Sequence, residues 1–282
     1  MGTPRSSVPD ADALDELWRT YYRATFNPAR LNPGAMRAEM PKKHWSTLPE
    51  TRDLRALVAE ALARVAAMAE SAPPTVLDVM PDDRRIPSLR AAATGCEACP
   101  LHGPATQTVF GEGPADARVV LVGEQPGDHQ EDRCGRPFQG PAGTLLRELM
   151  RGAGLPPAEA YLTNAVKHFR FRGKKRLHDR PRADEVQACR PWLVAELERV
   201  RPAVLVLLGA TATRSVLGQR VRSRDVRGKV LQTAFAPITL PTWHPAAVLR
   251  SDDPDALREE LSLALRHASR AARAKPREGD LV

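Results

Sequence analysis

The sequence predicts an α/β fold: three α/β/α layers around a central four-stranded parallel sheet, with a small helical N-terminal extension. Short apolar runs alternate with longer segments whose apolar residues recur at helical spacing, a pattern typical of a parallel sheet covered on both faces. Two of the runs end in glycine, where a buried strand gives way to a loop. The four expected strands span residues 118–122, 160–166, 203–208 and 237–240.

Helices are expected between and after these strands. Leucine, alanine and valine recur with helical period in residues 142–153, 183–200, 210–217 and 257–271. Two more helices are expected upstream, at residues 11–22 and 54–67. Prolines and charges around residues 71–85 then indicate a linker. The predicted organisation is a helical N-terminal extension and linker (1–85), an α/β domain (86–272) and a charged tail (273–282).

The composition favours an intracellular protein with a polyanionic partner. The 282 residues carry a formal net charge of +8, which suits nucleic acid. We find no apolar run long enough to span a membrane and no secretory signal, so we expect no membrane partner and a cytoplasmic location. Four cysteines in a chain of this length are too few for a disulfide scaffold.

Three motifs follow predicted strands, at the edge where a parallel sheet gathers its functional groups. The first, Gly123–Asp128, places the carboxylate of Glu124 at a strand end beside two glycines that let a ligand approach the backbone. Asn164 lies in the second strand, and His244 follows the fourth. Read alone, Glu124 also fits a solvated turn residue, and His244 also fits a helix cap.

A glycine- and proline-rich segment, Gly135–Gly143, leads into the helix expected at 142–153. It contains Phe138, whose ring could stack on an extruded base. A lone phenylalanine also fits a place in the core.

A basic segment follows the second strand. From Lys167 to Arg182 there are eight lysines or arginines and one acid, Asp179. Such a run is typical of a solvated or phosphate-binding loop. Its charge does not explain why the run Lys174–His178 ends in a histidine.

The cysteines indicate a metal centre rather than disulfides. Cys96 and Cys99 form a Cys-x-x-Cys pair, and Cys189 supplies a third thiolate from a predicted helix. The residues alone leave the fourth ligand open between Cys134 and His168, and a zinc site remains an alternative.

Taken together, these motifs resemble the uracil-DNA glycosylase superfamily, specifically its iron–sulfur branch, families 4 and 5, over about residues 96–250. Within that branch the chain is most similar to the UdgX group, because of Gln125, His168 and the basic insertion ending in His178. Family 4 usually has a small residue at the first position and cysteine at the second, and lacks the insertion. Residues 21–45 resemble the end of a domain of unknown function often fused to such glycosylases.

The resemblance implies a 4Fe–4S cluster and a set of site residues. The implied cluster ligands are Cys96, Cys99, His168 and Cys189, which leaves Cys134 outside the set. In the implied pocket, Phe138 stacks on uracil, Asn164 pairs with its polar edge, and His244 stabilises the departing base. Glu124 stabilises the sugar cation or orients a nucleophile, while Gln125 and Asp128 shape the pocket. Lys174, Lys175, Arg176 and Arg250 are the implied DNA contacts.

The UdgX group also implies a nucleophile. In UdgX the loop reads Lys-Arg-Arg-Ile-His, and its histidine bonds to C1′ of the sugar after uracil leaves. Here Lys175 and Leu177 replace arginine and isoleucine, and His178 stays in register. Flanking cations should lower the pKa of His178, although Asp179 opposes them, so we expect neutral imidazole near neutral pH.

We therefore expect a monomeric repair protein that excises uracil from DNA, including single-stranded DNA, and stays covalently linked through His178. One alternative is a conventional glycosylase that uses the same pocket and releases its product. The other is a non-catalytic iron–sulfur protein that only binds DNA.

Overall fold

The structure is a computed structural model that describes residues 74–127 and 133–274, together with Ala59 and Ala63. The chain forms two compact units, Met1–Ala72 and Pro73–Val282. Ala59 and Ala63, in the first unit, are both helical and fall inside the helix expected at 54–67. The helix expected at 11–22 and the tail from residue 275 lie outside the described residues.

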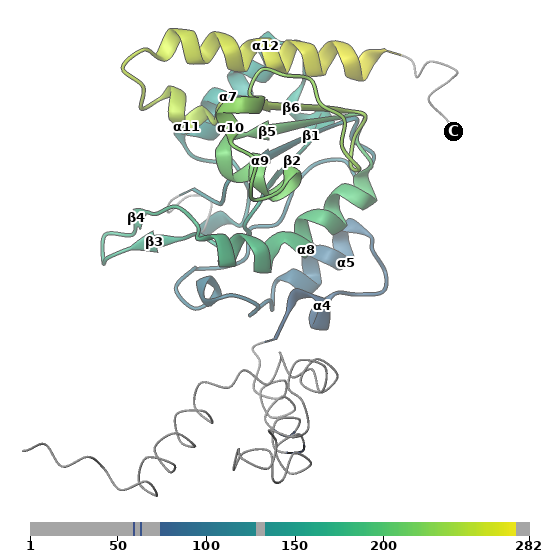
Figure 1. Cartoon of the computed structure of the whole chain (residues 1–282), viewed down its shortest axis with the longest axis vertical. Coiled ribbons are helices and arrows are strands. Elements are labelled where there is room, and N and C mark those ends of the chain that lie inside the picture. The colour runs from purple at the N-terminus through teal and green to yellow at the C-terminus, as the bar shows by residue number, and fades with distance from the viewer. Residues whose placement is uncertain (1–58, 60–62, 64–73, 128–132, 275–282) are drawn as a thin grey trace, which may run out of the picture. The chain divides into compact units, whose positions relative to one another are not determined.

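Four parallel strands form the centre of the second unit, as the sequence predicts (Figure 1). They are β1 (Val119–Gly123), β2 (Ala160–Asn164), β5 (Val204–Leu208) and β6 (Ile238–Thr242), in the order β2-β1-β5-β6. The predicted α/β fold with a four-stranded parallel sheet is confirmed.

Two strand ends differ from the prediction by two residues, and the others differ by at most one. β2 stops at Asn164, although the N–H groups of the next two residues still donate to the carbonyls of Gly123 and Glu124 at the end of β1. β6 continues through Pro241. Proline lacks the donor that a central strand needs, but β6 lies at the sheet edge, where this loss is tolerated.

Helices cover both faces of the sheet (Figure 1). One face packs against α7 (Pro141–Gly152), α11 (Pro245–Val248) and α12 (Pro254–Arg273); the other packs against α4 (Val76–Val79), α5 (Ile86–Ala93), α8 (Ala183–Val200) and α9 (Gly209–Leu217). The short elements are α10 (Ser223–Val226) and the 3-10 turns η4 (Pro100–His102) and η5 (Pro157–Glu159). Alternate residues of each strand serve opposite faces, so Val206 packs with α12 and Leu207 with α8. Among the described helices, none is both long and apolar enough to cross a membrane.

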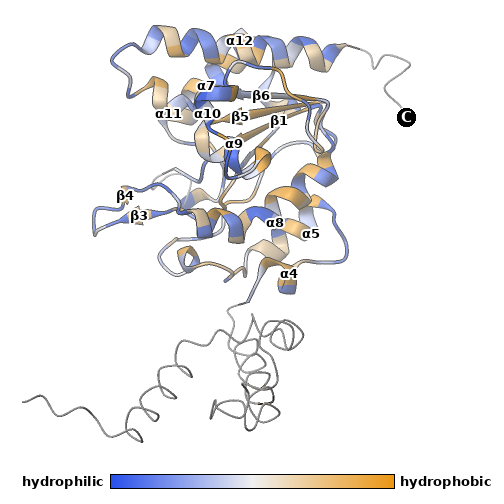
Figure 2. Ribbon diagram, in the orientation of Figure 1, coloured by the Kyte–Doolittle hydropathy of each residue, from blue (hydrophilic) through white to orange (hydrophobic). Residues whose placement is uncertain are grey.

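The basic segment, expected as a loop, is a small antiparallel hairpin. Its strands are β3 (Phe171–Arg172) and β4 (Leu177–His178), and Phe171 pairs with His178. Positive φ angles at Gly173 and Arg176 close the turn. The hairpin extends away from the sheet, and its hydrophilic residues contrast with the apolar strands (Figures 1 and 2).

Candidate active site and cluster site

The carboxyl ends of the four sheet strands bring the predicted pocket residues to one edge. Glu124 directly follows β1, and Asn164 is the last residue of β2. α9 begins directly after β5, and His244 lies between β6 and α11. The parallel topology therefore gathers residues that are far apart in the sequence.

Gly123 makes room for two of these side chains. A Cβ atom at this position would overlap Oδ1 of Asn164 and lie 2.7 Å from Cζ of Phe138. The amide of Asn164 and the ring of Phe138 thus flank the same point of β1. Both side chains are buried, at 2% and 3% exposure, and Phe138 also packs in the hydrophobic core on one face of the sheet, as its alternative interpretation predicts.

Phe138 has a strained backbone. Its φ angle is 58°, which is uncommon for a residue with a side chain and costs on the order of 1–3 kcal/mol. Arg147 donates to its carbonyl oxygen. Its ring lies 6.4 Å from the ring of His244, at an interplanar angle of 27°. The strained conformation therefore places a flat aromatic face beside His244 and Asn164.

His244 caps α11 and thereby fixes its own tautomer. Its Nδ1 accepts a hydrogen bond from the backbone N–H of Ala246 at 3.1 Å, so the proton of the neutral ring is on Nε2. Burial, with smaller effects from Arg250 and His178, lowers the pKa of His244 to about 4. At neutral pH the ring is an uncharged donor through Nε2.

Glu124 has three neighbours at its carboxylate. The hydroxyl of Thr211 donates to Oε2, and Nε of Arg180 lies 3.8 Å from the same oxygen. Nε2 of His178 lies 3.8 Å from Oε1. The carboxylate therefore lies between α9 and the hairpin, with its side chain 20% exposed.

Gln125 is buried and ties the base of the hairpin together. Its Oε1 accepts from the backbone N–H of Arg170 at 2.8 Å, which fixes the orientation of the amide. Its Nε2 donates to the carbonyl of Asp179 at 2.9 Å and lies 2.9 Å from Nε2 of His178. An amide nitrogen can only donate, so Nε2 of His178 accepts this hydrogen bond and carries the lone pair of the neutral ring.

The pKa of His178 is lowered, as predicted, but the main cause is partial desolvation of a side chain that is still 44% exposed, and not the flanking cations. Glu124 and Asp179 oppose the shift, and Arg250 and Arg180 support it. Arg250, predicted as a DNA contact, is exposed and lies close enough to lower the pKa of both histidines of the site.

The three hairpin cations predicted to contact DNA have different environments. Lys174 and Lys175 are exposed in the turn. The guanidinium of Arg176 lies over the rings of Phe171 and Phe169, 4.3 and 5.6 Å from their centres. Arg176 therefore has a packing role, and its contact with DNA stays a prediction.

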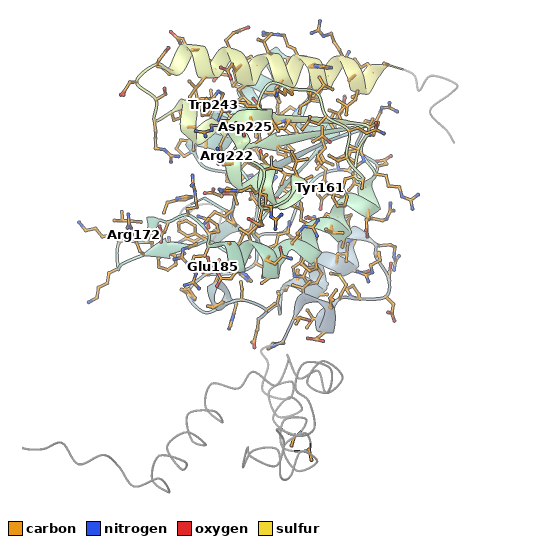
Figure 3. The ribbon with its side chains drawn as sticks, in the orientation of Figure 1. Tyr161, Arg172, Glu185, Arg222, Asp225 and Trp243 are labelled. Carbon is orange, nitrogen blue, oxygen red and sulfur yellow. The ribbon has the colours of Figure 1, made fainter. Side chains whose placement is uncertain are left out.

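α8 holds the hairpin from the side. Arg170 donates to the buried carboxylate of Glu185 and also to Asp179 at 3.3 Å. Figure 3 labels Glu185 near the start of α8 and Arg172 on the hairpin. The same helix carries Cys189, so one element supports both the hairpin and the predicted cluster site.

The four predicted cluster ligands come together at one buried pocket. Cys96, Cys99, His168 and Cys189 all line it and are at most 8% exposed. All four cysteines of the chain lie in the described part and form no disulfide. Cys134, set apart from the ligands, is exposed.

Hydrogen bonds orient three of these four side chains. Trp192 Nε1–H donates to Sγ of Cys96 at 3.3 Å, and the N–H of Lys167 donates to Sγ of Cys189 at 3.2 Å. The hydroxyl of Thr108 donates to a backbone carbonyl, so it accepts from Nε2–H of His168 at 2.9 Å. The lone pair of the neutral His168 ring is therefore on Nδ1. Histidines that bind metals commonly donate their other ring N–H to a neighbouring group in this way.

The four side chains share a pocket but do not form a mononuclear metal site. Within the described residues, no three His, Cys, Asp or Glu side chains converge closely enough to hold one metal ion, as mononuclear zinc requires. In a four-iron cluster each ligand binds a different iron, so the ligands lie farther apart. Burial raises the pKa of Cys189 to about 12 and also raises that of Cys99. Burial therefore favours the protonated thiols of both cysteines.

A buried ion pair lies between the cysteine-lined pocket and Asn164. Lys167 and Glu196 are 1% and 0% exposed and paired with each other. Lys167 Nζ also donates to the carbonyl of Asn164 at 2.8 Å, and Glu196 accepts from Tyr161 and Thr163. This network, which we did not predict, holds the carboxyl end of β2 in place.

Other contributors were also missed. Thr211 and Arg180 contact Glu124, and Trp192 contacts Cys96. Thr211 follows a predicted strand at the functional edge, so the rule that identified Glu124 would have identified it too. Asp128, predicted to shape the pocket, lies outside the described residues.

Comparisons with known proteins agree with this geometry. A family model described as "Uracil DNA glycosylase superfamily" matches residues 110–266, more than half of the chain. A second model, a domain of unknown function (DUF4130), matches residues 5–50. That match contains the whole of the segment, residues 21–45, that we compared with such a domain.

Curated relatives cover the same part of the chain. A type-4 uracil-DNA glycosylase of Thermotoga maritima is 41% identical over 157 residues, or 55% of this chain and 79% of the relative. A type-4 uracil-DNA glycosylase of Pyrobaculum aerophilum is 37% identical over 162 residues, or 55% and 80%. A type-5 uracil-DNA glycosylase of the same organism is 37% identical over 119 residues, or 37% and 50%.

Proposed function

Because the chain belongs to the uracil DNA glycosylase superfamily, we propose that it excises uracil from DNA and then bonds through His178 to C1′ of the abasic site. Support for excision comes from the family match and from the placement of Glu124, Asn164 and His244 at one sheet edge. Support for trapping comes from His178, which lies beside Glu124 in a neutral, lone-pair-bearing form.

The uracil nucleotide leaves the base stack to enter the site. Phe138 stacks on the extruded base, and the amide of Asn164 pairs with its polar edge, distinguishing uracil from cytosine. When the C1′–N1 bond breaks, its electron pair goes to uracil N1. Nε2–H of His244 donates to the uracil anion and stabilises it.

Bond breaking leaves positive charge on the sugar. The carboxylate of Glu124 stabilises this charge electrostatically. The hydroxyl of Thr211 and the guanidinium of Arg180 keep the carboxylate in place. The arrangement favours cleavage without requiring Glu124 to change its protonation state.

His178 then attacks the sugar. Its Nε2 lone pair forms a bond to C1′, and the alkylated ring carries one positive charge until its Nδ1 proton leaves to solvent. The uracil anion takes a proton from solvent. The observation that carries this step is the hydrogen bond from Gln125, which keeps a lone pair on Nε2 of His178 before reaction. Attack on C1′ requires Nε2 to give up this hydrogen bond.

A denaturing gel with uracil-containing single-stranded DNA tests the proposal. The wild-type chain should give a shifted band that survives heat and detergent. His178→Ser should lose that band, because serine cannot supply the imidazole lone pair. The matched control is His267→Ser, since His267 lies on α12 outside the site.

The other outcomes identify the alternatives. Free abasic product without a shifted band from the wild-type chain would show a conventional glycosylase. No base excision by the wild-type chain, and no effect of Glu124→Gln, would show a protein that only binds DNA.

The proposal includes a 4Fe–4S cluster on Cys96, Cys99, His168 and Cys189. Support comes from the shared pocket, the N–H···S hydrogen bonds and the tautomer of His168. Bound there, the cluster would neutralise buried thiolates and join segments that are distant in the sequence. Cleavage of the base needs no electron transfer, so we assign it a structural role.

A further inference from the structure

A second basic surface lies beyond the hairpin. Five arginines line one open hollow of about 560 Å³ along α9 and α10: Arg180, Arg214, Arg220, Arg222 and Arg224. We call it the arginine hollow. Its lining contains no carboxylate, and Figure 3 labels Arg222 beside α10.

Most of this charge is not neutralised by neighbouring acids. Arg224 lies 3.6 Å from Asp225, and Arg180 lies 3.8 Å from Glu124. Among the described residues, Arg214, Arg220 and Arg222 form no ion pair with a carboxylate. Holding five like charges around one space costs free energy unless an anion enters.

The arginine hollow adjoins the reacting centre. Arg180 contacts Glu124 and also lines the hollow. Ala210, another lining residue, precedes Thr211, whose hydroxyl donates to the same carboxylate. A sugar held at Glu124 would therefore place a flanking phosphate within reach of this surface.

We infer that the arginine hollow binds backbone phosphates of the DNA strand next to the extruded nucleotide. The inference rests on the proposed function, because it needs DNA at Glu124. Guanidinium groups recognise phosphate with two parallel hydrogen bonds. The hollow is open and lined by charge, unlike the mostly apolar pockets that enclose small ligands. With the hairpin, whose base is Arg180, it forms a continuous track for one strand.

Salt dependence of DNA binding tests the inference. The probe is an oligonucleotide without uracil, so that no chemistry occurs, and the variant is Arg220→Gln with Arg222→Gln. Each phosphate contact contributes about 0.7 to the slope of log affinity against log salt for single strands. The variant should reduce the magnitude of that slope by about 1.4 and weaken binding roughly tenfold at low salt, whatever the sequence.

The matched control removes two arginines elsewhere, with Arg151→Gln and Arg199→Gln. These residues lie at the ends of α7 and α8, which lead to the amino ends of the strands, away from the functional edge. The control should keep the wild-type slope. Equal slopes in the two double variants would overturn the inference.

Failure of this inference and failure of the proposed function give different results. If the Arg220 and Arg222 variant loses binding of inorganic phosphate but keeps the DNA slope, the hollow is only an anion site and the inference is wrong. A wild-type chain that excises no uracil would overturn the proposed function. The slopes would then still report DNA binding, because the probe contains no uracil.

Discussion

At the residue scale, the site depends on which nitrogen of each histidine carries the proton. The backbone of α11 makes His244 a donor through Nε2. Gln125 makes His178 an acceptor through the corresponding nitrogen. Neighbouring hydrogen bonds thus give the same side-chain type two different chemical tasks.

Gln125→Glu tests the environment of His178. A carboxylate 2.9 Å from Nε2 favours the imidazolium, so the pKa of His178 should rise. Adduct formation at neutral pH should fall on the order of tenfold and recover as the pH is raised. Single-turnover gel assays across a pH series measure this shift.

Gln232→Glu, an exposed substitution beyond the site, is the control for added charge and should keep the wild-type profile. An unchanged pH profile for Gln125→Glu would show that this amide does not set the state of His178.

His244 should also make stability depend on pH. Its folded pKa is about 4, whereas an unfolded histidine titrates near about 6.5. The unfolded state therefore binds more protons between these values, so stability should rise with pH from about 4 to about 6.5. Its contribution should be below about 1.4 kcal/mol per pH unit.

Urea unfolding at several pH values measures this slope. His244→Gln should reduce it without abolishing it, because the pKa of His178 is lowered in the same direction. An identical slope in the variant would contradict the assignment.

At the scale of elements, α8 connects the two parts of the site. It carries Cys189 at the pocket, Glu185 toward the hairpin, and Glu196 against the end of β2. The hairpin itself is two short strands whose antiparallel pairing places Phe171 opposite His178. A shift of α8 would therefore disturb the proposed ligand Cys189, the proposed nucleophile His178 and the strand that carries Asn164 together.

Glu196→Gln should destabilise the protein strongly. It leaves the ammonium of Lys167 buried without its counter-charge, which costs about 3–5 kcal/mol. Urea unfolding would show the loss as a lower midpoint. Glu198→Gln, an exposed neighbour on the same helix, should change stability by less than about 0.5 kcal/mol. Equal stability of the two variants would show that the buried pair contributes little.

At the scale of the whole molecule, the proposed cluster joins three separate parts of the chain. Cys96 and Cys99 precede the sheet, His168 follows β2, and Cys189 lies on α8. Their side chains share one pocket with Trp192. A cluster there would crosslink the second unit.

Cys189→Ser should therefore remove the visible absorbance and the iron, and lower the melting temperature by roughly 10 °C. Cys134→Ser is the matched control, because that exposed cysteine lies outside the pocket. Iron analysis and thermal unfolding measure both effects. Full iron content in Cys189→Ser would contradict this ligand set.

Much of the fold and site follows from the sequence. Apolar runs determine the four strands, helical periodicity determines α7, α8, α9 and α12, and the strand-end rule identifies Glu124, Asn164 and His244. These features are local, because burial and periodicity are recorded in neighbouring residues.

Only the tertiary structure decides the rest. The pairing of Lys167 with Glu196 and the approach of Arg180 to the arginines along α9 and α10 join residues distant in the sequence. So does the contact of Gln125 with His178, which gives each nitrogen its role. The stacking of Arg176 on Phe171 depends on the hairpin pairing. Protonation and tautomer depend on burial and on neighbours in space. The sequence by itself therefore determined which groups are present, and the fold decided which of them are charged, neutral or ready to react.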